Sequence, residues 1–227
     1  MKIPRAPHSW LVTPHRAIEI QRELSGRIIH TGQPEKLSLV GGADLAFSPD
    51  KQDCIAGVVV WDIRADQVVE QHVVRRPAVF PYIPGLLSFR EAPALVAVLR
   101  EIRCEPDAFI FDGQGLAHPR RFGLACHVGL LIDRPSLGCA KSVLVGTCDM
   151  PSPAKGSTTV LEHNGECIGR AVRTREDVKP VYVSLGHRLS LQAAVTITLA
   201  CCTRYRLPEP TRLADQLVAH ERAKITR

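Results

Sequence analysis

Two apolar stretches of this chain each contain one aspartate. If the stretches form buried strands, each charged side chain carries a high free-energy cost. Asp44 interrupts the run Leu39–Phe47, and Asp112 ends the run that starts at Ala108. A buried carboxylate is costly unless it is paired or binds a cation. Two such aspartates on neighbouring strands suit a shared hard divalent cation and metal-assisted phosphodiester cleavage. The alternative is that each aspartate only begins a turn, which for Asp112 before Gly113 is an equally good interpretation.

The size of the chain and its apolar content favour one compact domain spanning residues 1–227. Of its 227 residues, 45% are hydrophobic, enough for a sizeable core. No run is long enough to span a membrane and the N-terminus has no apolar signal core, so we expect a cytoplasmic protein with no membrane partner.

The net charge bears on the class of partner, and the cysteines bear on metal binding. Lys and Arg exceed Asp and Glu, giving a net charge of +6, which favours a polyanionic partner. The eight cysteines are scattered without a Cys-x-x-Cys pair, so we expect reduced, mostly buried thiols and no zinc site.

The order of the expected elements predicts an α/β fold. Helices are expected over 15–29, 87–103, 121–131, 190–203 and 211–224, and strands over 39–47, 54–63, 68–75, 108–112, 139–145, 158–163, 166–173 and 181–184. Short polar breaks make the first three strands antiparallel, and the helices between later strands imply parallel crossovers. This matches a ribonuclease H-like fold: a mixed central sheet, with antiparallel strands 1–3 and then parallel strands, flanked by helices.

Four acidic residues occupy the positions from which that fold draws its acids. They lie on the first strand, the following helix, the fourth strand and, in its first turn, the last helix: Asp44, Glu91, Asp112 and Asp215. The alternative for the two helical acids is a favourable interaction with the helix dipole.

Six segments carry far more specific motifs. They are GGAD at 41–44, FPYIPGLLSFRE at 80–91, FDGQGLAHPRR at 111–121, GCAKS at 138–142, GHR at 186–188 and LPEPTRLAD at 207–215. Together they resemble the endonuclease V family, the deoxyinosine endonucleases, over nearly the whole chain and in the family's order. The resemblance implies a monomeric DNA-repair enzyme that acts on deoxyinosine in single- or double-stranded DNA. It implies Mg²⁺-dependent hydrolysis, in which Mn²⁺ can substitute, of the second phosphodiester bond 3′ to the lesion, leaving 3′-hydroxyl and 5′-phosphate ends.

The resemblance also assigns roles to the acids and to one lysine. Asp44 and Asp112 are expected to ligate the metal directly, while Glu91 and Asp215 hold metal-bound water or complete a second site. Lys141 is expected beside the scissile phosphate, where a cation offsets developing charge. The alternative for Lys141 is an exposed edge lysine that discourages aggregation.

The loop after the third strand is expected to separate the bases. Tyr82 stands between Pro81 and the pair Ile83 and Pro84, which suits a stiff apolar wedge that fills the gap left by an extruded nucleotide. A surface turn whose tyrosine packs on the core is the alternative. Gly85 and Leu87 are then expected to line a base pocket that reads hypoxanthine through backbone groups and apolar surface.

The turn after the Asp112 strand and one later histidine complete the expected nucleic-acid contacts. They are Gly113, Gln114, Gly115, His118 and His187, of which His187, just before a helix, is either structural or in contact with the substrate. Three positions depart from the common family pattern or vary within it. Many members have Gly-His-Gly at 113–115 and Lys-Lys at 141–142, and the position of Asp215 is aspartate in some and histidine in others. These differences bear on substrate breadth and metal preference.

Three other functions remain open at this point. One is another ribonuclease H-like nuclease that cuts hybrids or branched DNA, which does not need the Pro81–Pro84 segment. A second is a basic nucleic-acid-binding module without catalysis, which would bind without Mg²⁺ and cut nothing. The third is cleavage of inosine-containing RNA, because no residue is identified that reads a 2′-hydroxyl.

Overall fold

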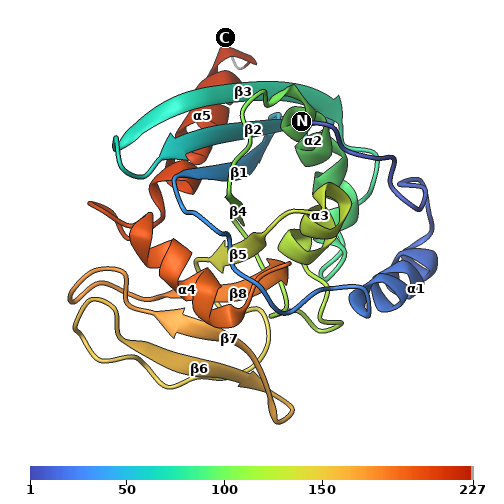
Figure 1. Ribbon diagram of the computed structural model, residues 1–227. Helices are drawn as coiled ribbons and strands as arrows, with labels where there is room; N and C mark the ends of the chain where they lie inside the picture. The colour runs from blue at the N-terminus through green and yellow to red at the C-terminus, as the bar shows by residue number, and fades with distance from the viewer. Residues whose placement is uncertain (226–227) are drawn as a thin grey trace.

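The computed structural model describes residues 1–225 and arranges them around one large sheet (Figure 1). The helices are α1 Pro14–Ser25, α2 Leu87–Glu101, α3 Leu124–Ile132, α4 Leu191–Ala200 and α5 Glu209–Ile225. The strands are β1 Leu39–Phe47, β2 Asp53–Asp62, β3 Gln67–Pro77, β4 Ala108–Phe111, β5 Ser136–Ala140, β6 Thr158–His163, β7 Glu166–Val172 and β8 Val181–His187.

The sheet has eight strands in the order β3-β2-β1-β4-β5-β8-β7-β6, from top to bottom in Figure 1. The first three strands are antiparallel, and β4 and β5 then extend the sheet in parallel with β1, as the sequence predicts. Beyond that prediction, β8 and the β6–β7 hairpin continue the sheet with antiparallel pairs. Asn164 and Gly165 take the positive φ angles of 57° and 77° that the hairpin turn requires.

Helices cover both faces of the sheet. One core packs α2 and α3 against β1, β2 and β4, and a second packs α4 against β4, β5 and β8 on the opposite face. The start of α5 lies against β1 at Gly42, where an added Cβ would come within 2.2 Å of the Pro210 carbonyl carbon. Glycine at this position therefore lets the last helix approach the middle of the first strand.

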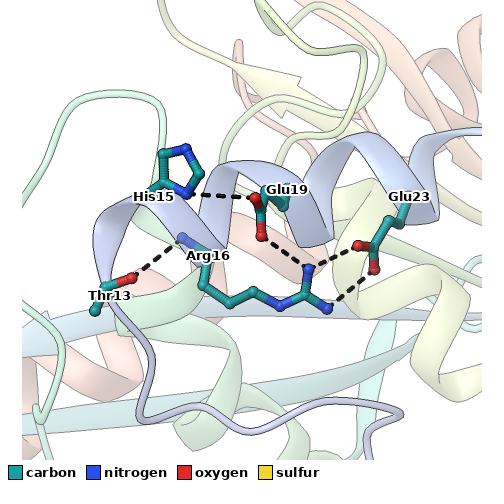
Figure 2. A network of polar contacts seen from close by, with 5 residues as sticks. All are labelled: Thr13, His15, Arg16, Glu19 and Glu23. Atoms are coloured by element: carbon teal, nitrogen blue, oxygen red, sulfur yellow. Dashed lines mark hydrogen bonds and ion pairs between the residues drawn. The ribbon is translucent and has the colours of Figure 1, made fainter.

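Helix α1 packs outside these two layers and has a well-defined start. The Thr13 side chain accepts a hydrogen bond of 3.3 Å from the Arg16 amide, and Pro14 follows in the first helical turn. Arg16 also pairs with Glu19 at 3.0 Å and with Glu23 at 2.7 Å, as Figure 2 shows. The buried face of α1 contacts the core formed by the loop before α2 and by α3.

Two boundaries differ from the sequence-based prediction and change the position of functional residues within their elements. Strand β5 ends at Ala140 rather than at residue 145, since its partner β8 begins only at Val181, after a proline that lacks an N–H. Lys141 therefore lies in the turn after the strand. Helix α5 already begins at Glu209, because a proline is tolerated in a first turn, so Asp215 is in the second turn rather than the first.

Two smaller boundaries also differ. Helix α1 ends at Ser25 rather than at residue 29. Strand β8 continues from residue 184 to His187, so this histidine ends a strand and α4 begins only at Leu191.

The remaining composition-based expectations concern thiols and membranes. All eight cysteines are unpaired, and five of them are buried, as predicted. Within residues 1–225, no helix combines the length and the apolar character that crossing a membrane requires.

Candidate active site

Asp44 and Asp112 are neighbours because of the parallel register between β1 and β4. Ala43 pairs with Phe111 in that register, so the two aspartates are the next residues along adjacent strands. The Asp112 amide donates to the Ala43 carbonyl at 3.4 Å. Since side chains alternate along a strand, both carboxyl groups project from the face that α5 approaches.

Asp215 and Glu91 bring two further carboxyl groups to this position from helices on opposite faces of the sheet. Asp215, on α5, lies close enough to Asp44 to raise the pKa of that carboxyl group. Glu91, on α2, is only 9% exposed, and its charge interacts with those of Asp44 and Asp112. The structure therefore gathers all four predicted acids into one acid cluster.

Two carboxyl groups of the acid cluster, those of Asp44 and Glu91, hold their protons more tightly than isolated carboxyl groups do. Burial, followed by the charge of Asp112, raises the pKa of Asp44 to about 7. Burial, followed by the charges of Asp44 and Asp112, raises the pKa of Glu91 to about 8. The Glu91 carboxyl makes no hydrogen bond to any residue within 1–225, and the charge of Arg90 offsets its burial only in part.

Lys141 supplies positive charge at one edge of the acid cluster. Its Nζ lies 2.5 Å from Oδ2 of Asp112. Burial alone would lower the lysine pKa, but the hydrogen bond to Asp112 and the nearby carboxylates raise it, so the ammonium form is favoured. The side chain is 47% exposed and can exchange this partner for a ligand.

The donor set of the acid cluster fits a hard divalent cation. It consists of carboxylates, which are the oxygen ligands that Mg²⁺ takes, and the raised pKa values show that negative charge there is undercompensated. Among residues 1–225, no three acidic, histidine or cysteine side chains are already arranged to hold a metal ion. A cation would therefore have to draw the carboxyl groups together and displace Lys141 from Asp112.

A pocket of about 390 Å³ opens directly beside Asp112 and Lys141. One wall is the segment from Tyr82 to Ser88, and the facing wall runs from Ala140 to Leu144. Its floor includes Gly113, Gln114, His118, Gly123 and Leu124. The pocket is of the size for a small planar ligand and reaches the acid cluster through Asp112.

The Gly85 carbonyl fixes the first wall of the pocket. It accepts hydrogen bonds from Gln21 Nε2 at 3.1 Å, His118 Nε2 at 3.0 Å and Arg120 Nη2 at 2.5 Å. Gly85 has φ of 78°, a conformation that favours glycine. Burial lowers the pKa of His118 to about 4, so its ring is neutral; it donates through Nε2 and accepts from the Arg120 amide through Nδ1.

Gln114 leaves an unpaired acceptor in the floor of the pocket. Its Nε2 donates to the Ser142 carbonyl at 2.9 Å, which fixes the orientation of the amide. Its Oε1 is buried and has no hydrogen-bond partner within residues 1–225. A buried acceptor without a partner is costly unless a ligand or water donates to it.

Tyr82 projects away from the protein at the rim of the pocket. It is 72% exposed, which excludes packing on the core as the reason for its position. Ile83 and Pro84 line the pocket, whereas Pro81 faces a separate hollow next to Trp10. The rim thus carries an exposed aromatic ring on a proline-stiffened loop.

Besides Pro81, two predicted contact residues lie outside the pocket. Gly115 packs against β8, and its amide donates to Ser184 Oγ at 2.9 Å. His187 is 1% exposed, accepts from the Ile29 amide at 3.3 Å and contacts Asp133 at 3.1 Å. His187 therefore connects the end of β8 to the segment after α1, and the structure does not bring it to the acid cluster.

The structure also reveals site residues that the sequence-based prediction missed. Gln21 is 1% exposed. It lies four residues after Ala17, on the buried face of α1, and this helical spacing is the signal that could have identified it. Arg206 had no such signal. It donates to the carbonyls of Lys141 at 3.0 Å and Pro180 at 2.7 Å and so holds the turn that carries Lys141.

The sheet order and the acid cluster define a nuclease of the ribonuclease H-like class. The family model for endonuclease V matches residues 22–216. An endonuclease V of Gloeobacter violaceus is 49% identical over 223 residues, covering 94% of this chain and 91% of that protein. The chain belongs to the endonuclease V family.

Solved structures of the family agree with this fold. The endonuclease V of Streptomyces avermitilis superposes with a TM-score of 0.92 at 39% identity, covering 100% of both chains. A D234N variant of Ciona intestinalis endonuclease V was solved with a DNA containing an inosine followed by a ribo-adenosine. That structure has a TM-score of 0.83 at 27% identity and covers 94% of this chain and 100% of that one. The ribonuclease H-like fold predicted from the sequence is confirmed.

Proposed function

We propose that this protein recognises deoxyinosine in DNA and hydrolyses the second phosphodiester bond 3′ to it, leaving 3′-hydroxyl and 5′-phosphate ends. The observation that carries the proposal is the contact between a pocket and an acid cluster. Asp112 belongs to both, so a base held in the pocket brings the adjoining backbone to the carboxyl groups. The inosine-containing DNA bound by the Ciona intestinalis enzyme supports the same substrate class.

The base pocket offers groups suited to the edge of hypoxanthine. Gly85, Leu87 and Gly113 supply backbone and apolar surface, and Gln114, which also lines the pocket, carries the unpaired acceptor Oε1. Hypoxanthine carries a proton on N1 and adenine does not, so an acceptor in the floor favours the deaminated base. His118 acts through the Gly85 carbonyl, which it helps to fix, rather than as an acid or a base.

Asp44 and Asp112 would hold Mg²⁺, which Mn²⁺ can replace, and Glu91 and Asp215 would position the attacking water or complete a second site. The cation would supply Lewis-acid stabilisation of the phosphate and a lowered pKa for the water. The raised pKa values of Asp44 and Glu91 mean that these residues give up protons when positive charge arrives. Lys141, which pairs with Asp112 at the edge of the acid cluster, would face the charge that develops on the scissile phosphate.

Tyr82 would enter the base stack and fill the space of the extruded nucleotide. Its 72% exposure and the prolines on either side leave the ring free to insert without rearrangement of the core. The basic balance of the chain, +6, favours the polyanionic partner. We further propose that residues 1–227 act as one catalytic domain and as a monomer, in the cytoplasm.

Cleavage of matched oligonucleotides tests this function. Single-stranded and duplex DNAs carry either one deoxyinosine or one deoxyadenosine at the same position, with Mg²⁺ or with chelator, and RNA versions of both are run in parallel. The expected result is one cut in the deoxyinosine DNA, at the second bond on its 3′ side, only with Mg²⁺. A preference for inosine RNA would identify RNA rather than DNA as the substrate. Equal cutting of the adenosine controls would contradict the proposal.

A further inference from the structure

A second hollow adjoins the acid cluster, and the predicted site residues other than Asp215 do not reach it. It is a groove of about 640 Å³ between the end of β1 and helix α5. Its lining includes Phe47, Lys51, Asp215, Val218 and Arg222, and we call it the β1–α5 groove. It shares no lining residue with the base pocket.

The acid cluster lies between the two hollows. Asp112 lines the base pocket, Asp215 lines the β1–α5 groove, and Asp44 interacts with both of these aspartates. A strand that enters the base pocket and continues along the protein therefore crosses the four acids before it reaches the groove. The order of pocket, acids and groove gives the bound strand a direction.

The groove carries positive charge beyond the acids. Lys51 and Arg222 lie on opposite walls, one in the loop after β1 and one on α5. Lys51 makes no ion pair with residues 1–225 through its side chain, whereas its backbone is fixed at both ends. Its amide donates to the Ser48 carbonyl at 2.8 Å, and its carbonyl accepts from Arg90 at 3.1 Å. Arg90 in turn lies 4.5 Å from the Phe47 ring centre and stiffens this wall.

We propose that the β1–α5 groove binds the phosphate backbone of the strand on the 3′ side of the cut, with Lys51 as a phosphate contact. The inference rests on the proposed function, because a cut 3′ to the base places the downstream nucleotides beyond the acids. Continuity with the acid cluster and the basic walls favour a polyanionic strand as the occupant. The product fragment that carries the 5′-phosphate is then the one that the groove binds.

Binding and cleavage by Lys51→Gln on strands of different geometry test this proposal. One single-stranded inosine DNA has a 3′ arm of about ten nucleotides, a typical length for strand-binding grooves. A second has the same total length but a 3′ arm that ends just beyond the scissile bond. Lys36→Gln is the matched control, since Lys36 is an exposed lysine before β1, at the other end of the same strand. Binding is measured by fluorescence anisotropy in chelator over a salt series, and cleavage in Mg²⁺.

We expect Lys51→Gln to weaken binding of the long 3′ arm about 3- to 10-fold and to reduce its salt slope by about 0.7, the value for one phosphate contact to a single strand. Binding of the short 3′ arm stays unchanged, and Lys36→Gln resembles the parent on both strands. Equal losses on both arms, no loss on the long arm, or the same loss in Lys36→Gln would overturn the assignment of the groove.

The same experiment, run together with the adenosine controls of the cleavage assay, separates the groove from the proposed function. If the parent protein does not prefer inosine over adenosine but Lys51→Gln still weakens only the long 3′ arm, the proposed function fails and the groove assignment stands. If the parent cuts inosine DNA as proposed and the arm length makes no difference to Lys51→Gln, the groove assignment fails and the proposed function stands.

Discussion

The wall of the base pocket and the acid cluster beside it hold their polar groups in opposite ways. In the wall, the Gly85 carbonyl accepts from three donors, Gln21, His118 and Arg120. In the acid cluster, Glu91 is buried without a hydrogen bond, and burial together with like charge raises its pKa. The pocket wall is internally satisfied, whereas the acid cluster is short of positive charge.

This difference separates stability from catalysis. Groups that are already satisfied hold the pocket in shape before a ligand arrives, so losing one should cost folding free energy. The carboxyl groups of the acid cluster repel one another and so lower the stability of the metal-free protein. Changing one of them should therefore reduce activity without reducing stability. Four single substitutions, at Asp112, Lys141, Tyr82 and Gln21, test this contrast.

Asp112→Asn should abolish cleavage. It removes a carboxylate from the pair that would hold the metal, while the amide keeps the size of the side chain. Its thermal stability should match or exceed that of the parent, because one like charge leaves the acid cluster and only the ion pair to Lys141 is lost. Cleavage of deoxyinosine DNA and a melting curve measure both effects. Near-normal turnover in Mg²⁺ would remove Asp112 from the metal site.

Lys141→Ala should slow cleavage by about 100-fold or more, the typical cost of one lost electrostatic donor to a transition state. Strand binding should change less, since the proposed partner of the ammonium is charge that develops during the reaction. Single-turnover rates and anisotropy separate the two quantities. Equal losses in rate and binding, together with a shallower salt dependence, would make Lys141 an ordinary phosphate contact.

Tyr82→Ala should reduce cleavage of duplex inosine DNA about tenfold, because stacking of one ring on a base contributes about 1–3 kcal/mol. The loss should be smaller on a single strand, where less stacking has to be broken. Tyr82→Phe is the control and should be nearly normal, since the wedge needs the ring and not the hydroxyl. The melting temperature should not change, because the side chain is 72% exposed. An unchanged duplex rate in a stable Tyr82→Ala protein would exclude the wedge.

Gln21→Ala should act on stability more than on chemistry. Its amide donates to the carbonyls of Gly85 and Phe122 and accepts from Arg120, all in a buried position. Leaving these groups unpaired costs about 1–3 kcal/mol, or several degrees in melting temperature for a chain of this size. In the folded protein, the rate constant for cleavage of bound substrate should change less in Gln21→Ala than in the other variants. A large fall in that rate without loss of stability would mean that the pocket wall contributes to chemistry directly.

The fold and the acids could be predicted because both leave local signals. The apolar run located β1 at its observed bounds, and an aspartate inside that run is conspicuous because burial makes it costly. The Phe80–Glu91 motif identified the pocket wall through resemblance. By contrast, the spacing of Gln21 from Ala17 indicates only that it is buried. Its place beside the pocket depends on the packing of α1 beside α3, a contact between residues far apart in sequence.

The remaining differences also have a tertiary cause. The end of β5 depends on where its partner β8 begins, which no residue of β5 encodes. For that reason the sequence placed Lys141 inside a strand, although it lies in the following turn held by Arg206. The motif left His187 as either a structural residue or a substrate contact. Its hydrogen bonds with Ile29 and Asp133 join segments far apart in sequence, and no local pattern encodes them.

The most direct test of the central claim, that a cation completes the acid cluster, is the Mg²⁺-induced shift in melting temperature as a function of pH. The metal-free fold raises the pKa of Asp44 from 3.8 to about 7 and that of Glu91 from 4.5 to about 8. Since the unfolded chain loses these protons at lower pH, the metal-free fold becomes less stable as pH rises through this window. Mg²⁺ binds the ionised carboxylates, so its stabilising effect should grow from about pH 5 to about pH 8.5. We predict this growth in the parent protein and its loss in Asp112→Asn. A Mg²⁺ shift that is absent, independent of pH, or unchanged in Asp112→Asn would mean that no cation completes the acid cluster.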